Sequence, residues 1–276
     1  CRMIPHEFLK FTPATNCGEC GYPACLAFAV AVTKGGVSPK LCPYVNSKDL
    51  PADVAPPQTE GGLDAVDRGQ EKRDMALVTH LKSKVKDLDF NALSRRLAAD
   101  WSAEDPDVLR FSFLGRPVEL GRTFVAMGDE QLVDPRDQIL LYNYVAFGGG
   151  RIPDGTWVGM ESLPNSISKI RTLATYCELR LAKRFSSRAE ILTALCSEIG
   201  AVSGPADQSA DVGMIISVMP HVPLYLLFWD EEPEDGFEAK VKVLFDHHVM
   251  DFLDLESLVF AAERMADLLA ELDVDV

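Results

Sequence analysis

The sequence has no apolar run long enough to cross a membrane, because the longest, Ala24–Val32, falls well short of the ~20 residues that a spanning helix needs. No basic segment leading into an apolar stretch and a cleavage site marks an export signal. Basic residues are scarce, with 27 Lys and Arg against 42 Asp and Glu, a net charge of −15. Nucleic-acid binding needs clustered cations, so we expect no nucleic-acid partner. Because neither a membrane span nor an export signal is seen, we expect a cytoplasmic protein.

Signatures of several enzyme classes are also missing. The chain has no Gly-x-Ser-x-Gly elbow, no His-Glu-x-x-His helix and no Gly-x-x-x-x-Gly-Lys-Ser/Thr phosphate loop. Its composition, 47% hydrophobic and 25% charged, is that of an ordinary globular protein. These absences favour a redox carrier or accessory protein over a catalyst acting on its own.

Charge and cysteine are unevenly distributed along the chain. Residues 1–50 carry a net charge of +2 and the remainder −17, and five of the seven cysteines precede residue 47. Residues 47–72 are rich in proline, glycine and charge, which is typical of a linker. We therefore predict a small cysteine-rich domain at 1–46, a linker at 47–72 and a larger domain at 73–276.

The larger domain mixes helix and strand signals. Helix starts are indicated by Asp89, by Asp134-Pro135, by a capping box at Ser187–Glu190 and by Asp254. Alternation predicts strands at 109–113 and 239–245, and the apolar run 222–229 predicts a strand covered on both faces, with a hairpin loop at 230–236. The fold class is therefore α+β, with a partly antiparallel sheet flanked by helices.

The strongest chemical signal is the cysteine pattern near the amino end, Cys17-x2-Cys20-x4-Cys25-x16-Cys42 followed by Pro43. Four thiolates can complete the coordination of one iron–sulfur cubane, one per iron. The glycines at 18 and 21 allow the backbone to curl closely around inorganic sulfur. After Cys25, an apolar stretch predicts a short helix that ends at Gly35-Gly36.

Three other interpretations use the same cysteines. A structural zinc site also takes four thiolates, usually as two Cys-x2-Cys pairs. A disulfide pair fits poorly with a reducing cytoplasm. Four unrelated structural cysteines would leave the neighbouring glycines unexplained. The two remaining internal cysteines, Cys177 and Cys196, lie on apolar helical stripes and are expected to be small buried side chains.

Residues 16–29, with Gly35 and Cys42-Pro43, resemble the 4Fe–4S module of corrinoid iron–sulfur protein large subunits. Similar modules occur in a subunit of membrane-associated, ferredoxin-oxidising electron-transport complexes. The resemblance covers about residues 5–46 and implies that Cys17, Cys20, Cys25 and Cys42 ligate one low-potential cluster that moves single electrons, for example to reactivate an oxidised corrinoid. The Asp-x-His-x-x-Gly motif that places histidine beneath cobalt in that subunit is absent.

From about residue 75 onward, the chain resembles a family of domains of unknown function that is often fused behind such a module. The matching stretches are Ile139–Tyr144, Gly155–Val158, Pro220–Leu224, Trp229–Glu232 and Leu244–Asp246. This second resemblance implies co-occurrence with the cluster module and no particular chemistry.

Three residues of the larger domain, His221, Trp229 and His247, are candidates for lining a second cofactor site. Neighbouring residues on a strand face opposite sides, so His247 and His248 are not expected to share one metal ion, whereas one of them could pair with His221. Ordinary structural roles compete, since Trp229 also fits a core position at a strand end. The acidic stretch at 231–238 could form a cation site or an acidic docking patch, but a solvated turn is favoured. The glycines at 148–150 with Arg151 could hold an anion, but a helix stop is favoured.

Two functional hypotheses follow. The first is an electron-transfer or redox accessory protein of anaerobic, corrinoid-linked metabolism, with one 4Fe–4S cluster and a redox protein or a corrinoid- or cofactor-carrying protein as partner. The second is a cofactor- or metal-binding enzyme or accessory factor, whose larger domain holds a second cofactor that the cluster reduces.

Overall fold

The computed structural model describes residues 4–15, 20, 22, 24–35, 37–46, 50, 62–128, 133–205 and 209–274, without the side chains of 34–35 and 62–72. The chain divides into two compact units, Cys1–Gly69 and Gln70–Val276. Within the described ranges, no helix is both long and apolar enough to cross a membrane.

The first unit contains short helices around a small apolar core. They are α1 (Pro5–Phe8), the 3-10 helix η1 (Leu9–Phe11), α2 (Cys25–Gly35) and the 3-10 helix η2 (Pro39–Leu41). The helix predicted after Cys25 is confirmed as α2. Its inner face packs Phe28 edge-on against Phe8 of α1, with ring centroids 5.9 Å apart. This aromatic contact joins the two helices around one shared core.

Helix α3 (Gly62–Val85) overlaps the end of the predicted linker. Residues 62–72 of that linker are helical. They contain a single internal glycine after Gly62 and no proline, and a run of charged residues is as compatible with a solvent-exposed helix as with an irregular linker. The remaining linker positions, apart from residue 50, lie outside the described residues.

The second unit begins within α3 and continues with α4 (Phe90–Arg96) and a four-stranded antiparallel sheet. The strands follow one another in the order β1 (Asp100–Ser102), β2 (Asp105–Phe113), β3 (Arg116–Gly121) and β4 (Val125–Met127). Helix α5 (Pro135–Phe147) is tied to this sheet by the buried Tyr142 hydroxyl, which donates to the carbonyls of Gly121 and Phe124 at 3.0 Å.

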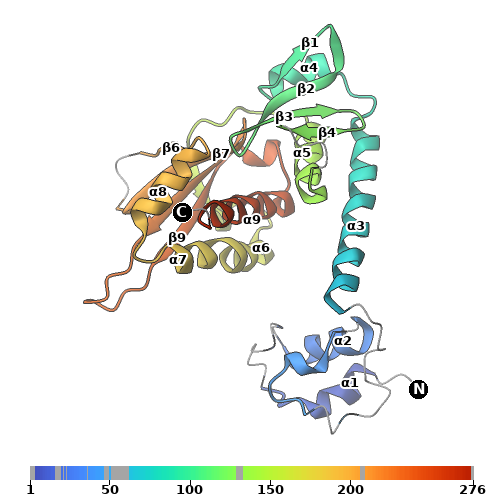
Figure 1. Cartoon of the computed structure of the whole chain (residues 1–276), viewed down its shortest axis with the longest axis vertical. Helices are drawn as coiled ribbons and strands as arrows, with labels where there is room; N and C mark the ends of the chain where they lie inside the picture. Colours follow the sequence, from blue (N-terminus) through green and yellow to red (C-terminus); the bar gives the residue numbers. More distant parts are fainter. Residues whose placement is uncertain are drawn as a thin grey trace. The chain divides into compact units, whose positions relative to one another are not determined.

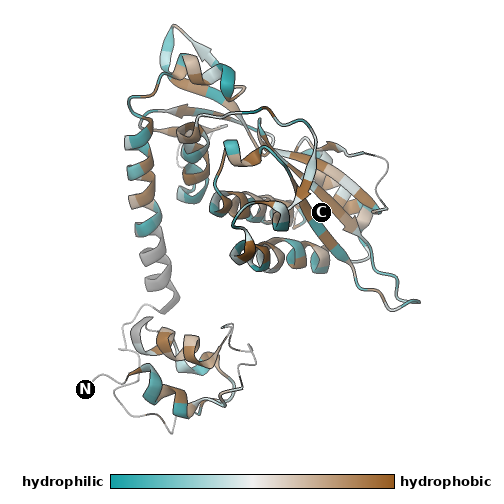
Figure 2. Ribbon diagram, turned by 180° about the vertical axis from the view of Figure 1, so that it is seen from behind, coloured by the Kyte–Doolittle hydropathy of each residue, from teal (hydrophilic) through white to brown (hydrophobic). Residues whose placement is uncertain are grey.

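A second antiparallel sheet has the order β5-β9-β8-β7-β6. Its strands are β5 (Trp157–Gly159), β6 (Val202–Ser203), β7 (Val212–Met219), β8 (Val222–Trp229) and β9 (Lys240–Asp246). The central strands are predominantly hydrophobic (Figure 2). The α+β prediction is therefore confirmed, and the described strands form two antiparallel sheets rather than one. Leu114 joins the sheets by donating its N–H to the Val218 carbonyl at 2.9 Å.

Helices cover one face of the second sheet (Figure 1). They are α6 (Ile167–Leu173), α7 (Leu179–Phe185), α8 (Ala189–Glu198) and α9 (Leu255–Leu272), with the short 3-10 helices η4 (Met160–Ser162) and η6 (Val249–Asp251) beside them. On the other face, Tyr225 of β8 packs against Trp157 and donates to the Pro205 carbonyl. Strand β8 is thus covered on both faces, as its continuous apolar run predicts.

Most of the predicted helix boundaries are confirmed because they depend on local hydrogen bonds. The carboxylates of Asp89, Asp134 and Asp254 each accept a backbone N–H of the first turn, and Gly148 ends α5 with φ of 71°. The capping box at Ser187 is wrong. Ser187 has φ of 60° and donates its hydroxyl to Glu231 instead of capping the helix. Arg188 takes the N-cap position, and α8 begins at Ala189.

Helices α6 and α7 are joined by a π-helical turn, η5 (Ala174–Glu178). Glu178 is the last residue of this turn, and its carboxylate accepts the Val243 N–H of β9 at 3.0 Å. Strand β5 pairs only with residues 244–246 of β9, so this bond satisfies a donor that the sheet leaves unpaired.

Candidate functional site

The cysteine module has three of its four predicted ligands among the described residues. Cys25 opens α2 and is buried, and Cys42 follows η2 and is 4% exposed. Cys20 is half-buried and packs against the same apolar cluster that contains Cys42 and Phe28. Cys17, Gly18 and Gly21 lie outside the described residues.

The local sequence explains how Cys42 reaches this cluster. Pro39 starts the 3-10 turn, and the Ser38 hydroxyl accepts the Lys40 N–H at 3.4 Å at its N-terminus. The turn then closes when Cys42 donates its N–H to the Pro39 carbonyl at 3.3 Å. Cys20 and Cys42 carry free thiols, so the cluster of apolar side chains is bordered by sulfur donors that are available to a soft metal.

The cysteines of the second unit have a different environment. Cys177 and Cys196 are fully buried in the main hydrophobic core. Burial raises the pKa of both thiols, that of Cys196 to about 12, so neither forms a thiolate near neutral pH. The prediction that they are small buried side chains is confirmed.

The structure does not bring His221 and Trp229 together. His221 precedes β8 and Trp229 ends it, so roughly 25 Å of extended strand separates them. His221 lies against the Phe252 ring, with centroids 5.0 Å apart, and donates its backbone N–H to the Tyr144 hydroxyl. Trp229 is half-buried and carries Lys240 over its ring at 5.6 Å. A single pocket lined by both residues is incompatible with this placement.

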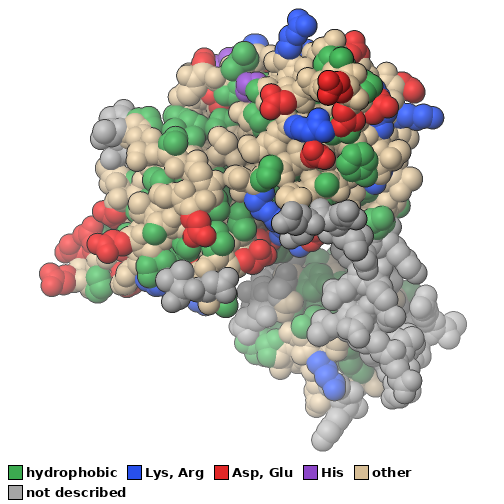
Figure 3. Space-filling model, turned by 45° about the horizontal axis from the view of Figure 1, so that its top comes forward, with side chains coloured by type: hydrophobic (Ala, Val, Ile, Leu, Met, Phe, Trp, Pro, Cys, Tyr) green, Lys and Arg blue, Asp and Glu red, His purple; other side chains and the backbone are tan. Residues whose placement is uncertain are grey.

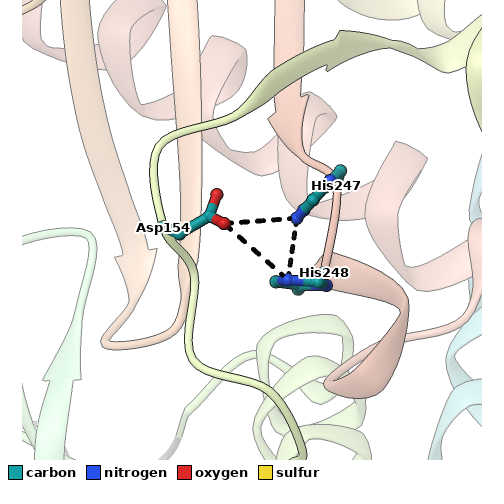
Figure 4. A group of neighbouring side chains, drawn as sticks. All are labelled: Asp154, His247 and His248. Carbon is teal, nitrogen blue, oxygen red and sulfur yellow. Dashed lines mark hydrogen bonds and ion pairs between the residues drawn. The ribbon is translucent and has the colours of Figure 1, made fainter.

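His247 lies instead beside His248 and Asp154 (Figure 4). The two imidazole Nε2 atoms are 2.7 Å apart, and the Asp154 carboxylate lies 3.5 Å from His247 and 3.9 Å from His248. The expectation that the two histidine side chains face opposite sides is wrong. Strand β9 ends at Asp246, and both histidines occupy the turn after it, where side chains no longer alternate between faces.

A buried carboxylate organises this group. Asp246 is fully buried and accepts the N–H groups of Asp154 and Gly155 on one oxygen and the N–H of His248 on the other. The residue therefore holds two segments, about 90 positions apart, at one edge of the sheet. Hydrogen bonds from Thr156 lower the pKa of Asp154, so its carboxylate is ionised at neutral pH.

Asp246-His247-His248 suggested a metal site from the sequence, but sequence reasoning missed Asp154 as a member of the group and Asp246 as the acceptor beneath it. The only local signal is the turn that Pro153-Asp154-Gly155 forms before β5, with φ of 84° at Gly155. The pairing of Trp157 with Asp246 brings this turn to the histidines, and that pairing is a long-range property of the sheet.

The glycines at 148–150 end α5, as predicted. A side chain at Gly149 would lie 2.9 Å from the Arg96 carbonyl, which explains the glycine there. Arg151 forms a bidentate ion pair with Asp251, and this pair lowers the pKa of Asp251 to about 2. The guanidinium is thereby engaged with a carboxylate of the chain itself.

The acidic stretch after β8 lies in the hairpin loop between β8 and β9. Most of its carboxylates are exposed to solvent: Glu232, Glu234, Asp235 and Glu238. Figure 3 shows acidic side chains gathered on this projecting part of the second unit. Their exposure agrees with the interpretation of a solvated turn.

Two family models match the chain, one in its amino-terminal part and one in the remainder. Residues 89–268 match the family described as "Domain of unknown function (DUF3786)", and residues 13–44 match the family described as "Putative Fe-S cluster". The second match includes all four cysteines of the motif.

Curated relatives share only the amino-terminal part. The corrinoid/iron-sulfur protein large subunit of Moorella thermoacetica is 43% identical over 72 residues, 24% of this chain and 16% of that protein. Subunit gamma 2 of the acetyl-CoA decarbonylase/synthase complex of Methanosarcina mazei is 38% identical over 52 residues, 18% of this chain and 11% of that subunit. The chain thus spans less than a fifth of the length of these relatives. No solved structure matches it.

Proposed function

The chain belongs to the DUF3786 family and carries an iron–sulfur cluster domain ahead of that family's domain, and from this we propose that it is a 4Fe–4S electron-transfer protein. Cys17, Cys20, Cys25 and Cys42 ligate one cluster, which exchanges single electrons with a redox protein or a corrinoid- or cofactor-carrying partner. The observation that supports this most is the match of residues 13–44, which contain all four of these cysteines, to the iron–sulfur cluster family.

The environment of the described cysteines fits such a cluster. Cys25 and Cys42 are buried, and the aromatic core around Phe8 and Phe28 lies beside Cys42. An apolar shell limits the approach of water to thiolate-bound iron, and its low polarity contributes to the reduction potential. When bound, the cluster supplies a reversible one-electron couple, while the chain's residues fix its ligands and its exposure.

The test of the cluster is metal and sulfide analysis of the full chain purified without oxygen. We expect about four irons and four sulfides per chain, broad absorbance near ~400 nm and a paramagnetic signal after one-electron reduction. The variant Cys42→Ala removes a ligand, whereas Cys196→Ala removes an equally buried cysteine of the second unit and serves as its control.

Iron and sulfide should fall to near zero in Cys42→Ala and stay at the wild-type level in Cys196→Ala. Zinc in place of iron, without sulfide, would overturn the proposal. Equal loss of iron from both variants would overturn the assignment of Cys42.

The corrinoid link is tested separately with cob(II)alamin as the electron acceptor. Reduced protein should pass one electron to each Co(II) centre, giving Co(I) and the oxidised cluster. Methyl viologen serves as a generic acceptor. Electron transfer to methyl viologen but not to cob(II)alamin would overturn the corrinoid link and leave the carrier function in place.

A second candidate function, the binding of a further cofactor by the second unit, is favoured by a groove of about 530 Å³. Its volume falls within the range of small-molecule sites. Apolar side chains such as Leu77, Ile139 and Phe260 line it together with the polar Lys84 and Asn143. Sharp absorbance bands beyond those of the cluster in the purified protein would support this function, and a pure cluster spectrum would count against a coloured cofactor.

A further inference from the structure

We propose that Asp154, His247 and His248 bind one divalent first-row transition metal ion, with Zn²⁺ as the representative ion. This site lies in the second unit and uses none of the cysteines, so it does not depend on the proposed function. Two imidazole nitrogens and one carboxylate oxygen all lie within 4.8 Å of one another. Among the described residues, no other group of histidine, cysteine and acidic side chains meets this condition.

The spacing of the donor atoms suits a small ion. Ligands of a tetrahedral zinc centre, at ~2.0–2.1 Å from the metal, lie about 3.3 Å from one another. The observed separations of 2.7, 3.5 and 3.9 Å lie on both sides of this value. His247 and Asp154 have exposed side chains, so small rotations can equalise the three separations without disturbing the core.

The backbone beneath the site is held rigidly. Asp246 bonds to the N–H groups on both sides of the group, and His247 donates its own N–H to the Thr156 carbonyl at 3.0 Å. One further bond, from the Thr156 N–H to the second oxygen of Asp154, orients the carboxylate. Such secondary contacts fix the direction of ligands before a metal arrives, which is the usual arrangement around protein metal sites.

The donor set also limits which ion binds. Imidazole nitrogen suits zinc, copper, iron and nickel, whereas magnesium and calcium take oxygen ligands. The histidines contribute neutral ligands and Asp154 a negative charge, which favours a divalent cation. His248 is 17% exposed at its side chain and Asp154 52%, so the ion is reached from solvent on one side. Three protein ligands leave at least one position for water, as in catalytic rather than structural zinc sites.

The test is calorimetric titration of Zn²⁺ into the full chain with its cysteines occupied by the cluster. His247→Gln and His248→Gln each remove an imidazole, and Asp154→Asn removes the charge while its amide oxygen still accepts the Thr156 N–H. The control is His80→Gln, because His80 is exposed on α3 and belongs to no such group.

We expect one Zn²⁺ per chain in the wild type and in His80→Gln, and a dissociation constant at least 10-fold larger in each of the three site variants. Tryptophan fluorescence during thermal unfolding provides a second readout, because Zn²⁺ should raise the midpoint in the wild type and in His80→Gln only. Equal affinity in His247→Gln and His80→Gln, or no saturable binding by the wild type, would overturn the site. Because cluster content is measured independently, failure of one proposal is distinguishable from failure of the other.

Discussion

Replacing Asp246 by alanine should destabilise the second unit strongly. The side chain is fully buried and accepts three backbone hydrogen bonds, from Asp154 and Gly155 at 3.0 and 2.8 Å and from His248 at 2.9 Å. Removing the carboxylate leaves these three donors without their acceptor. The turn before β5 and the turn after β9 then lose the group that joins them.

The size of the effect follows from the number of bonds. A hydrogen bond to a charged group contributes about 1.5–3 kcal/mol, so a simple sum exceeds 4 kcal/mol. Two corrections lower this sum. The desolvation of the carboxylate itself is also removed, and the N–H groups of the exposed residues Asp154 and Gly155 can turn to water. We therefore expect a loss of about 3 kcal/mol in the free energy of unfolding for Asp246→Ala.

The assay is urea unfolding followed by tryptophan fluorescence. All three tryptophans, Trp101, Trp157 and Trp229, belong to the second unit, so the signal reports that unit and not the cysteine module. With a slope of ~2–3 kcal/mol per molar urea, the midpoint should fall by about 1 M.

Two further variants sharpen the result. Asp246→Asn keeps an oxygen for the two donors of the turn but presents its amide N–H groups to the His248 N–H, so its stability should lie between those of the wild type and Asp246→Ala. The control Asp235→Ala changes an exposed carboxylate of the hairpin loop. An unfolding free energy of Asp246→Ala within about 0.5 kcal/mol of this control would refute the reasoning.

Three other predictions concern the second unit. Arg264→Met strips the buried Asp137 carboxylate of its bidentate partner on α9, and urea unfolding should show a loss of about 3–5 kcal/mol; a loss below 1 kcal/mol would contradict it. Burial lowers the pKa of His221 from its ordinary 6.5, so the unfolded chain binds a proton more readily than the folded chain. The free energy of unfolding should therefore fall as the pH drops below about 6.5, and this pH dependence should vanish in His221→Gln. Gly115→Ala places a Cβ 2.6 Å from the Ile199 carbonyl oxygen at φ of 77°, and thermal unfolding should show a loss of about 2–4 kcal/mol, whereas an unchanged midpoint would refute the clash.

Features that depend on neighbouring residues were predictable from the sequence. The caps at Asp89, Asp134 and Asp254 use a carboxylate two or three residues from the N–H that it accepts, and the strand at 222–229 shows as an unbroken apolar run. The exception at Ser187 has a long-range cause, because its hydroxyl binds Glu231 from the following hairpin instead of capping its own helix.

The sequence by itself determined the iron–sulfur module, the α+β class and several helix boundaries, since cysteine spacing, caps and apolar periodicity all act within single short segments of the chain. Only the tertiary structure decided that the strands form two sheets, that His221 and Trp229 are far apart and that Asp154 meets His247 and His248. The physical reason is that these arrangements depend on which strands pair. The pairing of β5 with β9 joins segments about 90 residues apart. It is made by backbone N–H and C=O groups, and because nearly every residue carries both, the sequence does not indicate which strands pair.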